Sequence, residues 1–146
     1  MAELFRSTPE KVAAMVAELR RTAESIGLPF GARTDTYNSR LAQELGIWAD
    51  DQGRGDQFHH AAFRAYFGDG RNLAREEVLV DIACKAGLAA SDAKRILAER
   101  TYRHRVDQDW NQARELAITA VPTFLAGGRR LVGAAGYNAL VRLVSP

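Results

Sequence analysis

Apolar residues recur at intervals of three and four along most of the chain, which is the period of one helix face. This pattern predicts six successive helices in residues 1–117. Their apolar positions are Val12, Met15, Val16, Leu19, Ala23 and Ile26; Leu41, Leu45 and Trp48; Phe58, Ala62, Ala65 and Tyr66; Val78, Leu79, Ile82 and Ala83; Ala93, Ile96 and Leu97; and Val106, Trp110, Ala113 and Ala117.

Cap and turn residues mark several of the expected helix ends. Ser7 and Glu10 have the spacing of a capping box, and Pro9 suits a first helical turn, where a backbone N–H would be unpaired in any case. Gly27 is a natural end for the same helix. Ser91 marks the expected start of the fifth helix.

The period changes near the C-terminus. Residues 123–126 and 129–132 are short strand candidates around Gly127-Gly128, a dipeptide typical of tight turns. Helical spacing then returns at Tyr137, Leu140, Val141 and Val144. The predicted fold class is therefore mostly α with a small α/β part, in which a helical domain precedes a β-hairpin and a final helix.

Composition favours a packed protein over a disordered one. The 146 residues fit one compact domain or a domain with a small lobe, and 47% of them are hydrophobic. The 20 basic and 18 acidic residues are interspersed and give a net charge of +2, so nucleic acid is not an expected partner. The sequence shows no apolar run of membrane-spanning or signal-peptide length. We expect no membrane partner and a cytoplasmic location.

Cys84 is the one cysteine of the sequence, so an intrachain disulfide cannot form. Free cysteines are among the most buried residues, and Cys84 lies near the C-terminal end of an expected helix, where the dipole disfavours a thiolate. We therefore expect Cys84 to be buried and unreactive. No catalytic residue is assigned.

The histidines lack the spacing of a metal site. His59 and His60 are adjacent and would diverge by about 100° on a helix, while His104 lies in a basic stretch. The sequence also lacks a glycine-rich phosphate loop. We expect neither a metal nor another cofactor.

The larger aromatic residues are interpreted as core, with a ligand cleft as the alternative for some of them: Trp48, Phe58, Phe63, Tyr66, Phe67 and Trp110.

Two segments resemble the DsbA family of thioredoxin-fold oxidoreductases, and especially its FrnE-like branch. Residues 58–67, with the following residues 70–73, resemble the family's helical domain. Residues 121–124, with the hairpin and residues 133–135, resemble its cis-proline loop, last two strands and final helix. The resemblance implies a helical insertion-type domain at 1–117 and the C-terminal half of a thioredoxin-like domain at 118–146.

The resemblance also implies a substrate-binding role for Val121, Pro122 and Thr123. In the family, the residue before the cis-proline offers backbone groups to an extended peptide, which binds like an added strand. The alternative is that Pro122 only begins a strand. The family's strand-helix-strand unit with its Cys-x-x-Cys motif has no counterpart in this sequence, which we interpret as truncated. The implied function is a protein disulfide oxidoreductase for peptide or protein thiols, without dithiol activity of its own.

Two other functions remain open. One is a non-catalytic peptide-binding or assembly module, and the other is a relative of 2-hydroxychromene-2-carboxylate isomerase or of kappa-class glutathione transferase.

In the family, the strand after the cis-proline pairs with the first strand of the fold. Without that strand, residues 123–126 would expose an unpaired edge, which favours pairing with another chain. We therefore expect a homo-oligomer formed through this strand.

Overall fold

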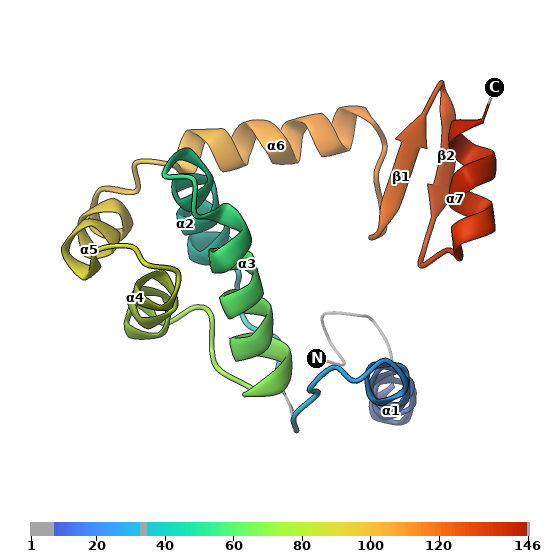
Figure 1. Ribbon diagram of the computed structural model, residues 1–146, viewed down its shortest axis with the longest axis horizontal. Coiled ribbons are helices and arrows are strands. Elements are labelled where there is room, and N and C mark those ends of the chain that lie inside the picture. Colours follow the sequence, from blue (N-terminus) through green and yellow to red (C-terminus); the bar gives the residue numbers. More distant parts are fainter. Residues whose placement is uncertain (1–7, 33–34, 146) are drawn as a thin grey trace. The chain divides into compact units, whose positions relative to one another are not determined.

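The computed structural model describes residues 8–32 and 35–145 (Figure 1). Within these residues it has seven α-helices, one π-helical turn and two strands. The mostly helical fold class with a C-terminal hairpin and helix is confirmed. The elements are α1 (Pro9–Ser25), α2 (Arg40–Asp51), α3 (Gly55–Phe63), η1 (Arg64–Gly68), α4 (Glu76–Lys85), α5 (Ala90–Glu99), α6 (Arg103–Glu115), β1 (Thr123–Ala126), β2 (Arg129–Val132) and α7 (Tyr137–Val144).

The chain divides into two compact units, residues 1–106 and 107–146. The first contains α1 to α5 and η1, and the second contains the hairpin and α7, while α6 spans the division. The domain boundary expected between residues 117 and 118 stays a prediction. No helix within the described ranges is long and apolar enough to cross a membrane.

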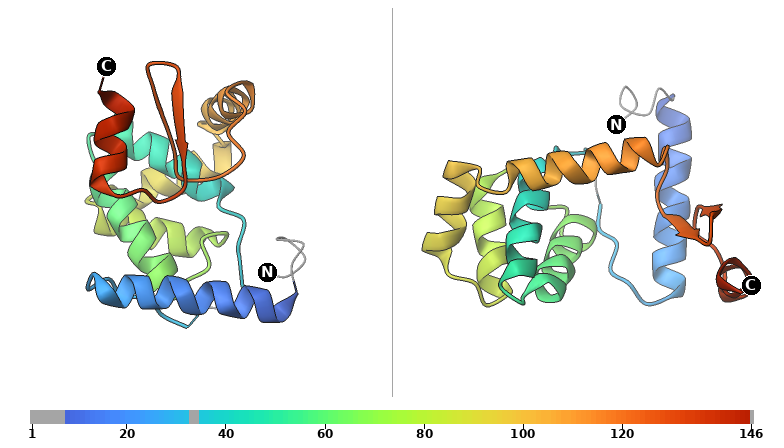
Figure 2. Two further views of the ribbon diagram at one scale, coloured as in Figure 1. Left: turned by 90° about the vertical axis from the view of Figure 1, so that its right-hand side faces the viewer. Right: turned by 90° about the horizontal axis from the view of Figure 1, so that it is seen from above.

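The core of the first unit is built from the inner faces of α2, α3, α4 and α5, which Figure 2 shows as one group. Helices α2 and α4 each contact the other three helices of the group. The sequence pattern predicted these faces because an amphipathic helix must bury its apolar side. The buried side chains include Leu45, Trp48, Ala49, Phe58, Leu79, Ile82, Ala83, Ala93, Ile96 and Leu97.

Other expected core residues are exposed. Phe63 is 61% exposed, and Trp110 on α6 is exposed as well, so the core interpretation is wrong for these two aromatic residues. Helix α1 has the expected apolar face, but only Val12 is buried, while Met15 and Leu19 are exposed. The spacing correctly places residues on one face, but a face is buried only where another element covers it.

Helix ends differ from the expected ones by one or two residues. Ser7 lies outside the described residues; α1 begins at Pro9, and Thr8 is its N-cap, with Thr8 Oγ1 accepting from the Lys11 N–H at 3.4 Å. Helix α5 begins at Ala90, one residue before Ser91. Helix α6 ends at Glu115, so Ala117 falls outside the sixth helix.

A buried carboxylate connects α2 with the start of α6. Glu44 on α2 is 1% exposed, and its two oxygens accept from Arg100 Nε at 2.9 Å and Arg100 Nη2 at 2.6 Å. Arg40 Nε donates to the same carboxylate at 3.1 Å, and Arg40 Nη2 donates to the backbone oxygen of Arg103, the first residue of α6, at 2.9 Å. The hydrogen bond from Arg100 is the main cause that lowers the pKa of Glu44, against the opposing effect of burial.

The second unit is an antiparallel hairpin with α7 packed against it. Thr123 pairs with Val132 and Ala126 with Arg129. Gly127 and Gly128 have φ values of 54° and 75°, the left-handed conformation that a type I′ hairpin turn requires at both central positions. Among the described strands β1 pairs only with β2, so its other edge has no strand neighbour.

Replacing Glu44 by glutamine should lower the free energy of unfolding at pH 7 by about 2 kcal/mol, because two arginines lose a charged acceptor. The same substitution should also make the free energy of unfolding depend less on pH in the acid range. The folded pKa lies below the ordinary value of 4.5, so ionised Glu44 stabilises the fold above that value, and its contribution is lost as the pH falls through the folded pKa. Urea unfolding between pH 7 and pH 3 measures both effects.

Glu18→Gln is the matched control, because Glu18 pairs with Arg21 on the exposed surface of α1. This control should unfold like the wild type at pH 7. If Glu44→Gln unfolds like the control, the buried ion cluster does not stabilise the fold.

Candidate functional site

The predicted substrate-binding residues lie in the loop between α6 and β1. Ala117 starts the loop in a left-handed conformation, with φ 49°. The Val121–Pro122 peptide bond is cis, as the family resemblance implies. Thr123 is the first residue of β1. The loop therefore leads directly into the strand with the unpaired edge.

Arg130 on β2 holds the beginning of this loop. Its Nη1 donates to the backbone oxygen of Ala117 at 2.8 Å, and its Nη2 donates to that of Leu116. The last carbonyl groups of a helix have no intrahelical partner and form the negative end of its dipole, so a guanidinium satisfies both features. Sequence reasoning missed Arg130, because an arginine at an exposed strand position gives no signal of a distant partner.

Arg129 makes the equivalent contact with α7. Its Nη1 donates to the backbone oxygen of Arg142 at 3.4 Å, and its Nη2 donates to that of Ser145. Both carbonyls lie at the C-terminal end of α7. Neighbouring arginines of one strand therefore bind the ends of two different helices.

Two further hydrogen bonds fix the middle and the end of the loop. Thr123 Oγ1 donates to the backbone oxygen of Ala120 at 2.6 Å. The Gly133 N–H donates to the backbone oxygen of Pro122 at 2.8 Å, which extends the hairpin ladder beyond β1. Thr123 thus has a positioning role in the loop, whereas the Pro122 carbonyl is already occupied.

Val121 is one of several exposed residues of the loop. It is 87% exposed, and no hydrogen bond among the described residues engages its N–H or its C=O. The neighbouring β1 adds Leu125, which is 43% exposed. The loop thus has main-chain groups without a hydrogen-bond partner among the described residues beside the apolar side chain of Leu125.

Cys84 lies on α4, outside this loop. It is exposed, so the expectation of a buried cysteine is wrong. The reason is that Leu79, Ile82 and Ala83 occupy the buried face of α4, which leaves Cys84 on the solvent side. Since the sequence contains no second cysteine, one copy of the chain cannot carry out exchange between two of its own thiols.

The described residues contain no group of three histidine, cysteine or carboxylate side chains that could hold a metal ion. The exposed His59 has Asp50 as a neighbour, with 3.9 Å between His59 Nε2 and Asp50 Oδ2.

A helical unit followed by a cis-proline loop, a hairpin and a final helix defines a thioredoxin-type protein of the DsbA class. The DSBA-like thioredoxin domain family matches residues 1–145. The chain belongs to this family.

Two relatives extend the comparison. The uncharacterized protein YwbO of Bacillus subtilis (strain 168) is 33% identical over 106 residues, which are 72% of this chain and 53% of YwbO. The crystal structure of probable DsbA oxidoreductase SCO1869 from Streptomyces coelicolor matches with a TM-score of 0.85 and 26% identity, over 97% of this chain and 62% of that protein. The chain thus spans about half the length of the curated relative and less than two thirds of the solved one.

Replacing Arg130 by alanine should loosen the loop, because the carbonyl groups at the end of α6 lose a charged donor. We expect exchange of the hydrogen-bonded backbone amides of residues 116–118 to become about tenfold faster, the equivalent of about 1.4 kcal/mol. Hydrogen–deuterium exchange measured by mass spectrometry follows this segment, with α2 as the internal reference.

Arg114→Ala is the control variant, since Arg114 is on α6 and its guanidinium donates to the nearby Asn111 side chain. Its loop should exchange at the wild-type rate. Equal acceleration in both variants would mean that Arg130 has no specific role in holding the loop.

Proposed function

We propose that this chain provides the substrate-docking part of a DsbA-family, FrnE-like protein disulfide oxidoreductase. The observation that carries the proposal is Val121, whose backbone N–H and C=O are unengaged among the described residues and lie next to the cis-proline. A peptide or protein thiol substrate would bind there in an extended conformation. Its main chain would pair with Val121, while the contacts of Arg130 and Thr123 keep the loop in shape.

The chemical step needs cysteines that this sequence does not contain. In thiol–disulfide exchange a thiolate attacks one sulfur of a disulfide, a mixed disulfide forms, and a second thiol releases it. Residues 1–146 contain only Cys84, so both thiols of a complete site would come from outside them. Support for the reaction class comes from family membership and from the structural similarity to probable DsbA oxidoreductase SCO1869.

A non-catalytic peptide-binding module is the second function that the geometry supports. It uses the same surface, because main-chain pairing at Val121 needs no thiol. The two functions differ in whether a cysteine pair from another polypeptide restores turnover. The docking residues and the inactivity of the isolated chain are common to both.

The isolated chain should not accelerate the reduction of insulin by dithiothreitol. Turbidity from precipitated insulin B chain measures the rate, and we expect the background rate of dithiothreitol alone. Cys84→Ser is the matched variant and should behave identically, since a single exposed thiol cannot complete the exchange. Turnover above background that Cys84→Ser abolishes would contradict the proposal.

We further propose that the open edge of β1 pairs with a second copy of the chain. An isolated two-stranded hairpin is marginally stable, and an exposed edge invites pairing. The half-buried Phe124 and the exposed Leu125 give this edge apolar side chains, and the location beside Val121 would make dimerisation compete with peptide binding.

Leu125→Lys should shift the chain from dimer to monomer, because a charge on an edge strand opposes pairing. Sedimentation velocity measures the change. Leu19→Lys is the control, since Leu19 is equally exposed but lies on α1. A wild-type chain that sediments as a monomer at high concentration would exclude the pairing.

A further inference from the structure

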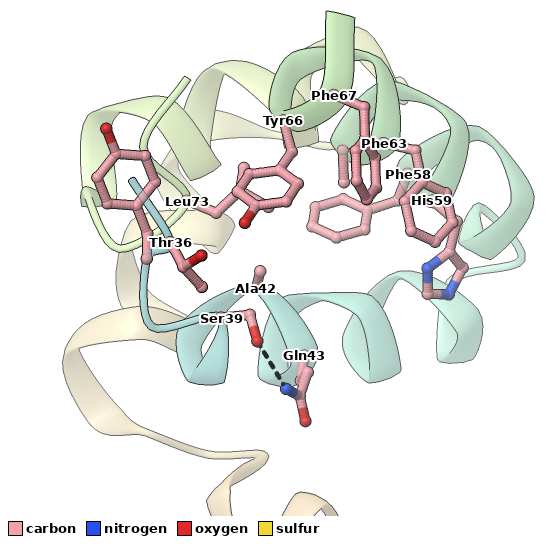
Figure 3. Close-up of a pocket in the computed structure, with 12 residues that line it drawn as sticks. Thr36, Ser39, Ala42, Gln43, Phe58, His59, Phe63, Tyr66, Phe67 and Leu73 are labelled. Carbon is pink, nitrogen blue, oxygen red and sulfur yellow. Dashed lines mark hydrogen bonds between the residues drawn. The ribbon is translucent and has the colours of Figure 1, made fainter. Parts of the chain in front are cut away.

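A cavity of about 430 Å³ lies in the first unit between α2 and the continuous segment of α3 and η1 (Figure 3). Its volume falls within the range of small-molecule sites. The residues around it include no lysine, arginine, aspartate or glutamate. Most of the wall is aromatic or aliphatic, from Ala42, Phe58, Ala62, Phe63, Tyr66, Phe67 and Leu73.

Thr36 contributes a polar atom to this wall that has no partner. Its Oγ1 is the one buried side-chain nitrogen or oxygen in the described residues that makes no hydrogen bond. A buried hydroxyl without a partner costs about 1–3 kcal/mol. The nearby Ser39 Oγ, by contrast, accepts from Gln43 Nε2 at 3.0 Å. A bound molecule could therefore supply the missing hydrogen-bond partner of Thr36 Oγ1.

The aromatic wall includes the rare π-helical turn η1. Such turns occur frequently at functional sites. Here the turn carries Tyr66 and Phe67, whose ring centroids lie 4.9 Å apart in an edge-to-face arrangement. Phe63 extends the aromatic surface, with its ring centroid 6.1 Å from that of Phe67. Figure 3 shows these rings on the α3–η1 side of the cavity, facing Ala42 on α2.

We propose that this cavity binds a small, neutral aromatic molecule that forms a hydrogen bond with Thr36 Oγ1. Burying an ion without a charged partner is costly, so walls without lysine, arginine or carboxylate side chains, in which His59 is the one basic residue, favour an uncharged ligand. Aromatic walls favour a planar ring, which can stack or pack edge-on. The volume equals the liquid share of about fourteen waters, which suits a molecule of one or two rings. This site is independent of the cis-proline loop and of the proposed oxidoreductase function.

N-phenyl-1-naphthylamine is a suitable probe, because it is neutral, fluoresces in apolar surroundings and has one N–H. We expect saturable binding of one molecule per chain. Thr36→Val keeps the shape of the side chain but removes the acceptor, so the dissociation constant should rise about five- to tenfold. The melting temperature of Thr36→Val should not fall, because its hydroxyl has no partner to lose.

Thr22→Val is the matched control, since Thr22 is on α1 and its hydroxyl donates to the backbone oxygen of Glu18. This control should bind the probe like the wild type. Ala42→Phe fills the cavity and should abolish probe binding, and circular dichroism checks that this variant is folded. If Ala42→Phe unfolds, the affinity of Thr36→Val for the probe is the test of the proposal. The absence of saturable binding, or wild-type affinity in Thr36→Val, overturns the proposal.

Discussion

The second unit depends on two adjacent arginines of β2. Arg130 binds the carbonyls of Leu116 and Ala117, which directly follow α6, and Arg129 binds those at the end of α7, so one strand connects both helices to the sheet. Each guanidinium meets the negative end of a helix dipole and supplies donors to otherwise unpaired carbonyls. A two-stranded hairpin has little stability alone, and these contacts with the packing of α7 supplement it. The exposed loop at Val121 has its start fixed by Arg130.

Periodicity predicted what depends on local sequence and missed what depends on distant partners. The buried faces of α2 to α5 follow from apolar spacing, and the Gly127-Gly128 turn follows from backbone geometry. The cis-proline loop was found through family resemblance on a few residues. The exposure of Cys84 and Phe63 was missed, because spacing shows which residues share a face but not whether another element covers it. The role of Arg130 was missed because its partners lie 13 and 14 residues away.

The two candidate binding sites differ in chemistry. Val121 presents main-chain donor and acceptor groups at an exposed loop, which suits an extended peptide of varied sequence. The cavity at Thr36 is largely aromatic, has no lysine, arginine or carboxylate side chain in its wall and contains one buried hydroxyl without a partner, which suits one small molecule. The Glu44 carboxylate in the same unit is also buried, but it accepts hydrogen bonds from Arg40 and Arg100. Among the described residues, the buried side-chain nitrogen and oxygen atoms are thus hydrogen-bonded, with Thr36 Oγ1 as the exception.

The most direct test of Val121 as the docking residue is a titration of the ¹⁵N-labelled chain with carboxymethylated insulin B chain, followed by NMR. The blocked thiols of this unfolded peptide exclude any disulfide with Cys84. Main-chain pairing predicts that the Val121 amide resonance shifts in a saturable way, with smaller changes along β1, while the resonances of α2 to α5 stay in place. Saturable binding that leaves the Val121 amide unchanged would contradict a docking site at the cis-proline loop.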